Sequence, residues 1–103
     1  MTTDKGVKLD IGKNRLGLVF SGFPNALWGL GQVGTFGANK YTDNGWQSVD
    51  NGYNRYQDAL FRHLFNNLKG EEIDSESELP HLFHALWNIC AMIEFKYGDV
   101  NVQ

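Results

Sequence analysis

Apolar residues recur at helical spacing along three segments of the chain, and this pattern predicts three helices. The first segment, 23–41, carries Pro24 in its first turn, where a helix tolerates proline. The second, 53–69, repeats apolar residues every three or four positions and stops at Gly70, a residue typical of helix C-termini. The third, 79–97, carries apolar side chains on nearly every side. Together the three segments indicate an all-α fold.

The remaining segments are predicted to form an arm and two loops. Residues 1–15 are polar and lack periodicity, whereas the short apolar run 16–20 is compatible with a strand that has no evident partner. Segment 42–52 contains Asp-Asn-Gly at both ends, and each copy is a strong turn signal. The acidic segment 70–78 predicts a solvated linker, and it has the spacing of a Ser75–Glu78 capping box for the third helix.

The third helix needs neighbours, because a helix that is apolar all round must be surrounded. A chain of 103 residues supplies too few elements for this. We therefore expect a single all-α domain over residues 1–103, a small bundle of about three main helices that is completed by oligomerisation into a homodimer or a higher even oligomer. Close approach of a helix or a ligand would also explain four glycines of the first helix, each costing about 1 kcal/mol relative to alanine: Gly29, Gly31, Gly34 and Gly37.

The charge and cysteine counts limit the classes of partner and compartment. Nine Lys and Arg face twelve Asp and Glu, a net charge of −3, so we expect no nucleic-acid partner. No apolar stretch approaches the ~18 residues of a membrane span, and the first residues do not resemble a signal peptide. The single cysteine, Cys90, cannot form an internal disulfide. These features predict a cytoplasmic protein that has no membrane partner.

The sequence does not support three familiar ligand motifs. Segment 29–34 matches G-x-G-x-x-G, but it lies inside a helical pattern instead of directly after a strand. No P-loop string occurs, and one cysteine with three histidines lacks the paired spacing of a zinc finger.

Polar residues form strips along the second and third helices. Arg55, Asp58 and Arg62 share one side of the second helix, either as an exposed ion pair or as an anion site in which the guanidiniums bind phosphate. The third helix aligns polar side chains that must face water, a ligand or a polar neighbour: His81, His84 and Asn88. After the first helix come a cation, a phenol, an amide and an indole that suit a nucleotide, although Trp46 alone would more simply cover the core edge: Lys40, Tyr41, Asn44 and Trp46.

Four strings that occur in order carry a resemblance to a known family. They are KLDIGKNRLGLV, TFGANKYTDNGW, RYQDALFRHLFNNLKGEEIDSESELPH and HLFHALWNICAMIEF. They resemble the dATP/dGTP diphosphohydrolase N-terminal domain family, which is largely phage-borne and related to the MazG-like all-α nucleoside triphosphate pyrophosphohydrolases. The resemblance implies hydrolysis of a purine deoxynucleoside triphosphate to the monophosphate and pyrophosphate, in the host cytoplasm if the gene is a phage's.

In the wider superfamily, Mg²⁺ is held by E-x-x-E and E-x-x-D pairs on two helices. This chain departs from that pattern, because its first helix has no acid and its second has only Asp58. Either the acidic loop supplies ligands, or the superfamily chemistry is absent. In the second case the protein would be a non-catalytic one that binds a nucleotide or a host protein.

The resemblance and the polar strips together give expected roles for individual residues. We expect Mg²⁺, or Mn²⁺ in its place, to be bound by Asp58 with Asp74 or Glu76. The catalytic residues would be Asp58, His63, His81 and His84. The purine deoxynucleotide would be bound by Lys40, Tyr41, Asn44, Trp46, Arg55, Arg62 and Asn88.

Overall fold

The computed structural model describes residues 6–98, and this part of the chain is helical without any extended strand. One isolated bridge pairs Ile73 with Pro80. The helices are α1 (Leu16–Gly22), α2 (Pro24–Lys40), α3 (Gly52–Leu68) and α4 (His81–Tyr97), with a short 3₁₀ turn, η2 (Gly45–Ser48). The all-α class is thereby confirmed, and the three expected helices are α2, α3 and α4.

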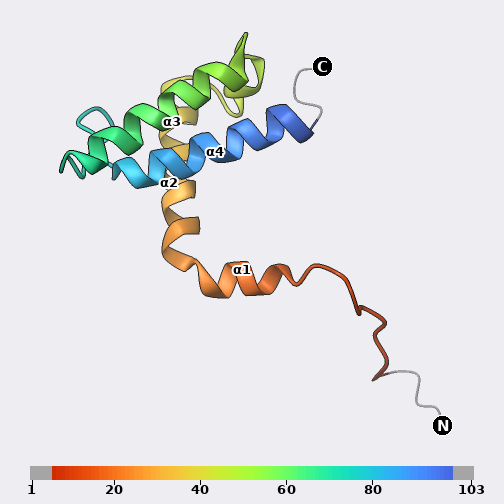
Figure 1. Ribbon diagram of the computed structural model, residues 1–103. Helices are drawn as coiled ribbons and strands as arrows, with labels where there is room; N and C mark the ends of the chain where they lie inside the picture. The colour runs from red at the N-terminus through yellow and green to blue at the C-terminus, as the bar shows by residue number, and fades with distance from the viewer. Residues whose placement is uncertain (1–5, 99–103) are drawn as a thin grey trace.

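Helices α3 and α4 form an antiparallel hairpin, and α2 approaches this hairpin from one side (Figure 1). An aromatic cluster joins the hairpin to η2. The Trp46 ring lies 5.6 Å from the ring of Trp87 and 5.7 Å from that of Phe95, both on α4, while Tyr56 of α3 lies 5.4 Å from Trp87. These edge-to-face contacts fix the position of the segment that follows α2.

The run 16–20, which was compatible with a strand, instead forms helix α1. This helix points away from the hairpin (Figure 1), and none of its residues is buried. The described chain is correspondingly extended, with a radius of gyration of 17.9 Å, whereas a compact domain of this size has about 13 Å. No helix among residues 6–98 has both the length and the apolarity needed to cross a membrane.

The predicted turns form, but the predicted helix cap does not. Asn44 and Asn51, the middle residues of the two Asp-Asn-Gly strings, adopt left-handed backbone with φ of 53° and 54°. Helix α4 begins two residues later than expected, after Pro80, and no side chain caps it. The Ser75–Glu78 capping box is therefore wrong, because the loop satisfies its polar groups through a different residue pair.

Only some of the glycines of α2 are explained by close packing. A side chain on Gly29 would lie 2.6 Å from the ring of Phe83, so α2 and α4 meet at a position that admits only hydrogen. Around Gly31 and Gly37 the described structure leaves open space. Close helix approach therefore accounts for Gly29 but not for these two.

Candidate functional site

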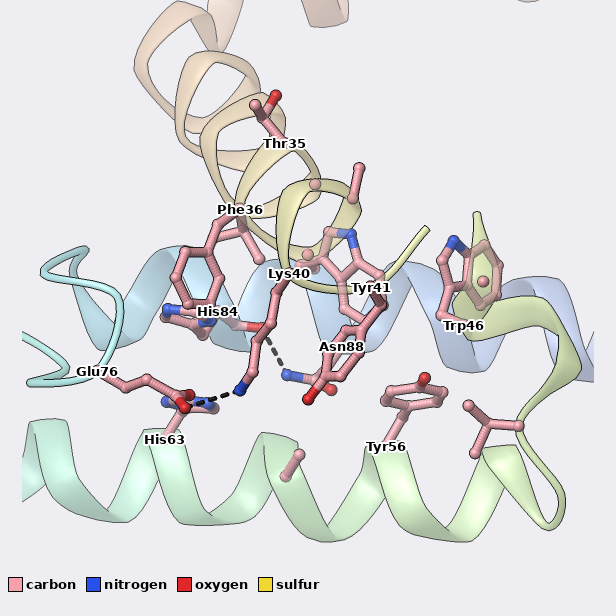
Figure 2. A pocket seen from close by; sticks show the side chains of 18 of the residues that line it. Thr35, Phe36, Lys40, Tyr41, Trp46, Tyr56, His63, Glu76, His84 and Asn88 are labelled. Atoms are coloured by element: carbon pink, nitrogen blue, oxygen red, sulfur yellow. Dashed lines mark hydrogen bonds and ion pairs between the residues drawn. The ribbon is translucent and has the colours of Figure 1, made fainter. Parts of the chain in front are cut away.

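A broad, open cavity of about 1130 Å³ lies between the C-terminal half of α2, the η2 segment, the hairpin and the acidic loop (Figure 2). Its wall includes most of the residues that the sequence singled out: Lys40, Tyr41, Asn44, Trp46, Arg55, Arg62, His63, Asp74, Glu76, His84 and Asn88. The fold thus brings together side chains from five separate segments. Two expected residues lie elsewhere: Asp58 is exposed on α3 outside this wall, and His81 reaches it only through His63.

Lys40 and Glu76 form an ion pair across the cavity. The Lys40 Nζ to Glu76 Oε2 distance is 2.7 Å, and the two side chains are 38% and 64% exposed (Figure 2). The Lys40 ammonium also lies 5.1 Å from the centre of the Tyr41 ring. The hydrogen bond to Glu76 raises the pKa of Lys40, so this residue supplies a permanent positive charge.

Arg55 and Arg62 line the same cavity from two turns of α3. They are spaced by seven residues, which is about 10 Å along a helix axis. Arg55 makes one long hydrogen bond of 3.5 Å to the backbone carbonyl of Asp50. The ion pair that the sequence allowed between Asp58 and Arg62 does not form. Both guanidiniums are exposed and face the cavity.

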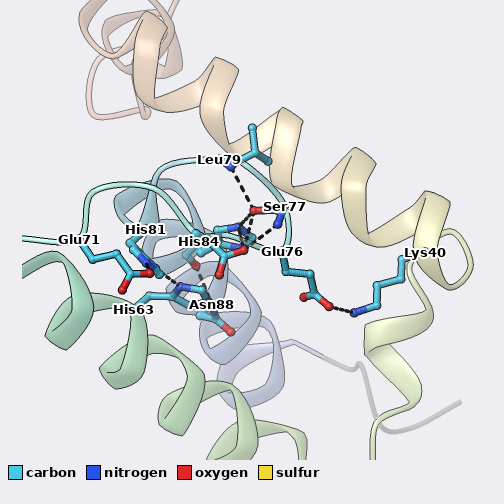
Figure 3. A network of polar contacts seen from close by, with 10 residues as sticks. Lys40, His63, Glu71, Glu76, Ser77, Leu79, His81, His84 and Asn88 are labelled. Atoms are coloured by element: carbon cyan, nitrogen blue, oxygen red, sulfur yellow. Dashed lines mark hydrogen bonds and ion pairs between the residues drawn. The ribbon is translucent and has the colours of Figure 1, made fainter.

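Three imidazoles gather where α3, the acidic loop and α4 meet (Figure 3). The rings of His63 and His84 stack with centroids 4.5 Å apart and an interplanar angle of 8°. His63 Nδ1 faces His81 Nδ1 at 2.8 Å, and His81 Nε2 lies 3.0 Å from Glu71 Oε1. His81 is 1% exposed, so the Glu71 carboxylate is the partner that satisfies the far side of a buried ring.

Burial sets the protonation of this cluster. Burial, followed by the neighbouring His84 and His81, lowers the pKa of His63 from 6.5 to about 4. Burial also lowers the pKa of His84, against the opposing effect of the Asp74 carboxylate. His63 is therefore neutral near pH 7, where it offers the cavity a lone pair or an N–H group instead of a positive charge.

Ser77 organises the acidic loop, and sequence reasoning assigned it no role. Its backbone N–H donates to Asp74 Oδ2 at 2.9 Å, its hydroxyl donates to the same oxygen at 2.8 Å, and His84 Nε2 lies 2.6 Å from the hydroxyl (Figure 3). Burial acts to raise the pKa of Asp74, but the two Ser77 hydrogen bonds and His84 outweigh it and lower the pKa. The spacing of Asp74 and Ser77, typical of a side-chain turn, was the available signal.

The aromatic residues divide between the core and the rim of the cavity. Trp46 is half-buried in the aromatic cluster, which agrees with the simpler interpretation that it covers the core edge, although it also lines the cavity. Tyr41 is 70% exposed at the rim. Asn88 is buried beneath the cavity and donates from Nδ2 to the carbonyl of His84 at 2.8 Å.

The fold and the cavity define a small all-α protein whose histidine-lined pocket combines three cations, Lys40, Arg55 and Arg62, with three acids, Asp43, Asp74 and Glu76. Comparison with known families matches residues 3–103 to dATP/dGTP diphosphohydrolase, N-terminal, and the chain belongs to this family. The resemblance seen in the sequence is thereby confirmed. Neither curated proteins nor solved structures gave a match.

The residues present do not form the four-carboxylate Mg²⁺ site of the wider superfamily. Helix α2 contains no acid, and the one acid of α3, Asp58, lies outside the cavity wall. Of the expected metal ligands, Asp74 and Glu76 line the cavity, and Glu76 is paired with Lys40. The donors that lie closest together are imidazoles, which Mg²⁺ disfavours. We therefore assign no catalytic step to a resident Mg²⁺.

Proposed function

We propose that this protein hydrolyses a purine deoxynucleoside triphosphate to the monophosphate and pyrophosphate in the cavity described above. The family is named for that activity. The observation that carries the proposal is the convergence of three cations, Lys40, Arg55 and Arg62, on one cavity, which is also lined by three acids, Asp43, Asp74 and Glu76. Guanidinium and ammonium groups bind phosphate oxygens through charge-assisted hydrogen bonds, so three of them in one cavity can hold a triphosphate.

The cations reach the cavity from two helices. The backbone positions of Arg55 and Arg62 are about 10 Å apart along the axis of α3, and their long side chains can bind different phosphate groups, with Lys40 approaching from α2. The base would then lie toward the rim of the cavity. There Tyr41 offers an exposed ring, Trp46 offers the edge of its indole, and Asn44 offers a side-chain amide. Hydrolysis of this substrate adds water across the α–β phosphoanhydride bond, and pyrophosphate leaves.

The polar floor of the cavity, formed by His63, His84 and Asn88, would position water and phosphate without adding charge. His63 is neutral near pH 7 because burial lowers its pKa, and Asn88 has an amide beneath it. Neutral imidazoles accept protons from an attacking water more readily than charged ones. In this proposal His63 and His84 line the cavity and contact the water or the phosphate. His81 does not line the cavity and orients the ring of His63 through the contact between their Nδ1 atoms.

The experiment measures hydrolysis of each of the four deoxynucleoside triphosphates in the presence of Mg²⁺ or Mn²⁺. Arg55→Ala and Arg62→Ala should each lower kcat/KM by about 10- to 100-fold, the loss expected for one charge-assisted hydrogen bond. Lys69→Ala is the matched control, because Lys69 is an exposed cation at the end of α3 that does not line the cavity. Normal turnover by both arginine variants would refute the proposal, provided that circular dichroism shows an intact helical fold.

The absence of the superfamily's carboxylates from α2, and of all but Asp58 from α3, favours a second candidate, a protein of the same fold that binds a purine nucleotide without cleaving it. Calorimetric titration with dATP and dGTP, run beside the hydrolysis assay, separates the two functions. Binding without product selects the second candidate. Absence of both binding and product leaves an engagement with another protein as the remaining alternative.

A further inference from the structure

Three potential metal-ligand atoms meet beside the cavity, and they come from three different segments. His63 contributes from α3, Asp74 from the acidic loop and His81 from the first residue of α4 (Figure 3). One ligand atom of each lies within 4.8 Å of the others. The two histidines face each other through their Nδ1 atoms at 2.8 Å.

The contact between Glu71 and His81 fixes which nitrogen of His81 carries the proton. An ionised carboxylate only accepts, so His81 Nε2 donates to Glu71 across 3.0 Å. In the neutral ring the lone pair then lies on Nδ1, which points at His63. A carboxylate behind a histidine that presents its other nitrogen is the arrangement found around metal-binding histidines, where it orients the ring and raises its basicity.

The loop that carries Asp74 is held by its own backbone. Asp74 N–H donates to the carbonyl of Leu79 at 2.9 Å, Glu78 N–H donates to the carbonyl of Asp74 at 2.8 Å, and His81 N–H donates to the carbonyl of Glu72 at 2.8 Å. Ser77 adds two hydrogen bonds to the Asp74 carboxylate. The three side chains are therefore positioned before any ligand arrives, and little conformational entropy is lost on binding.

We propose that His63, Asp74 and His81 bind a divalent transition-metal ion, with Glu71 as the outer hydrogen-bond partner of His81. Two imidazoles and one carboxylate suit Zn²⁺, Co²⁺ or Mn²⁺, and they do not suit Mg²⁺ or Ca²⁺, which take oxygen ligands. Three protein ligands leave positions open to exogenous ligands, as in catalytic zinc sites. Because His63 and Asp74 also line the cavity, those positions face it. The site stands whether or not the protein hydrolyses nucleotides.

A proton shared between the two Nδ1 atoms is the alternative explanation for their close approach. The two explanations differ in what added metal does. A metal site predicts saturable binding of one ion per chain, whereas a shared proton predicts no specific binding.

The experiment titrates the tag-free, chelator-treated protein with ZnCl₂ in a calorimeter, and with CoCl₂ while the visible absorption of the cobalt ion is followed. We expect one ion per chain and a cobalt spectrum of low-coordinate nitrogen and oxygen ligation. His63→Gln and Asp74→Asn should each weaken binding by at least about 100-fold, and Glu71→Gln by about 10- to 100-fold. His81→Gln is the less informative variant, because a residue that is 1% exposed is sensitive to any replacement.

Glu72→Gln is the matched control. It removes the same charge as Glu71→Gln from the neighbouring position of the acidic loop, where the Glu72 side chain is exposed. This variant should keep metal affinity within a few-fold of the wild type. Absence of saturable Zn²⁺ and Co²⁺ binding to the folded wild type, or an equal loss in Glu72→Gln and His63→Gln, would overturn the proposal. Neither outcome affects the hydrolysis assays of Arg55→Ala and Arg62→Ala. Failure of the metal-site proposal and failure of the proposed hydrolysis can therefore be distinguished.

Discussion

Lys40 and Glu76 are 36 residues apart in the chain, and their side chains form an ion pair of 2.7 Å that connects the end of α2 to the acidic loop. The pair lies at the cavity, so the lysine that best suits a phosphate already has an anionic partner. A triphosphate that binds Lys40 must displace Glu76 or share the lysine with it. The cavity therefore contains a competing internal anion.

Removing that competitor should strengthen nucleotide binding. Without added divalent metal, Glu76→Gln should raise the affinity for dATP or dGTP by about two- to five-fold, because an exposed ion pair is weak and its loss frees the lysine for phosphate. Lys40→Ala should lower the affinity. Titration calorimetry measures both, with Glu72→Gln as a control that removes the same charge from the same loop but outside the cavity wall. Weaker binding by Glu76→Gln would show that Glu76 assists the nucleotide instead of competing with it.

The two glycine environments on α2 predict opposite effects of the same substitution. Gly29→Ala places a methyl group 2.6 Å from ring carbons of Phe83, and the resulting overpacking should lower the free energy of unfolding by about 1–3 kcal/mol. Gly31→Ala meets open space and gains helix propensity, so it should raise that free energy by about 0.5–1 kcal/mol. Urea denaturation of both variants measures the difference. Stabilisation by Gly29→Ala would mean that α2 and α4 do not pack as described.

The sequence predicted the helices and turns well because these depend on local periodicity and backbone preference. The 3.6-residue pattern of α3, the Gly70 stop and the Asn44 and Asn51 turns are all properties of neighbouring residues. The start of α4 was misplaced because Ser77 binds Asp74 within the loop, so the expected Ser75–Glu78 box never forms.

The partnerships within the site depend on tertiary packing and were only partly predictable. Helical spacing placed His81, His84 and Asn88 on one strip, but it could not show that His81 turns toward Glu71 and His63. Asp58 shares its strip with two arginines, yet the cavity wall includes both arginines and leaves it out. A strip along a helix is wide enough to span the edge of a cavity, so one member can lie outside.

The low pKa of His63 predicts that acid destabilises the metal-free protein. The folded state holds His63 neutral down to about pH 4, whereas in the unfolded chain it takes up a proton near pH 6.5. The unfolded state therefore binds more protons between these values, so stability falls as the pH is lowered through this window. His84 acts in the same direction, because burial also lowers its pKa. Partial solvent screening limits the His63 contribution to about 1–3 kcal/mol.

Urea denaturation in the presence of a chelator measures this dependence. The free energy of unfolding should fall between pH 6.5 and about 4 for the wild type, and should fall less for His63→Asn, which removes the titrating group. Asp74 does not account for the loss, because its lowered pKa places its effect at more acidic pH. An identical slope in the two proteins would contradict the assignment to His63.

Helix α1 predicts self-association. A helix of seven residues is not stable alone in water, because nucleation costs more than so few hydrogen bonds return. Nevertheless α1 buries no residue within the chain, and Phe20 and Trp28 are 67% and 73% exposed around its junction with α2. Large apolar side chains exposed close together along the chain are typical of an interaction site. A second copy of the chain would cover these side chains, and we expect a homodimer or a higher even oligomer.

Sedimentation equilibrium should show the mass of this oligomer for the wild type and the mass of a monomer for a Phe20→Glu/Trp28→Glu variant. Lys13→Glu in the polar arm is the control and should leave the mass unchanged. A wild-type monomer at every concentration tested would refute the prediction, and the exposed side chains of α1 would then require a different partner.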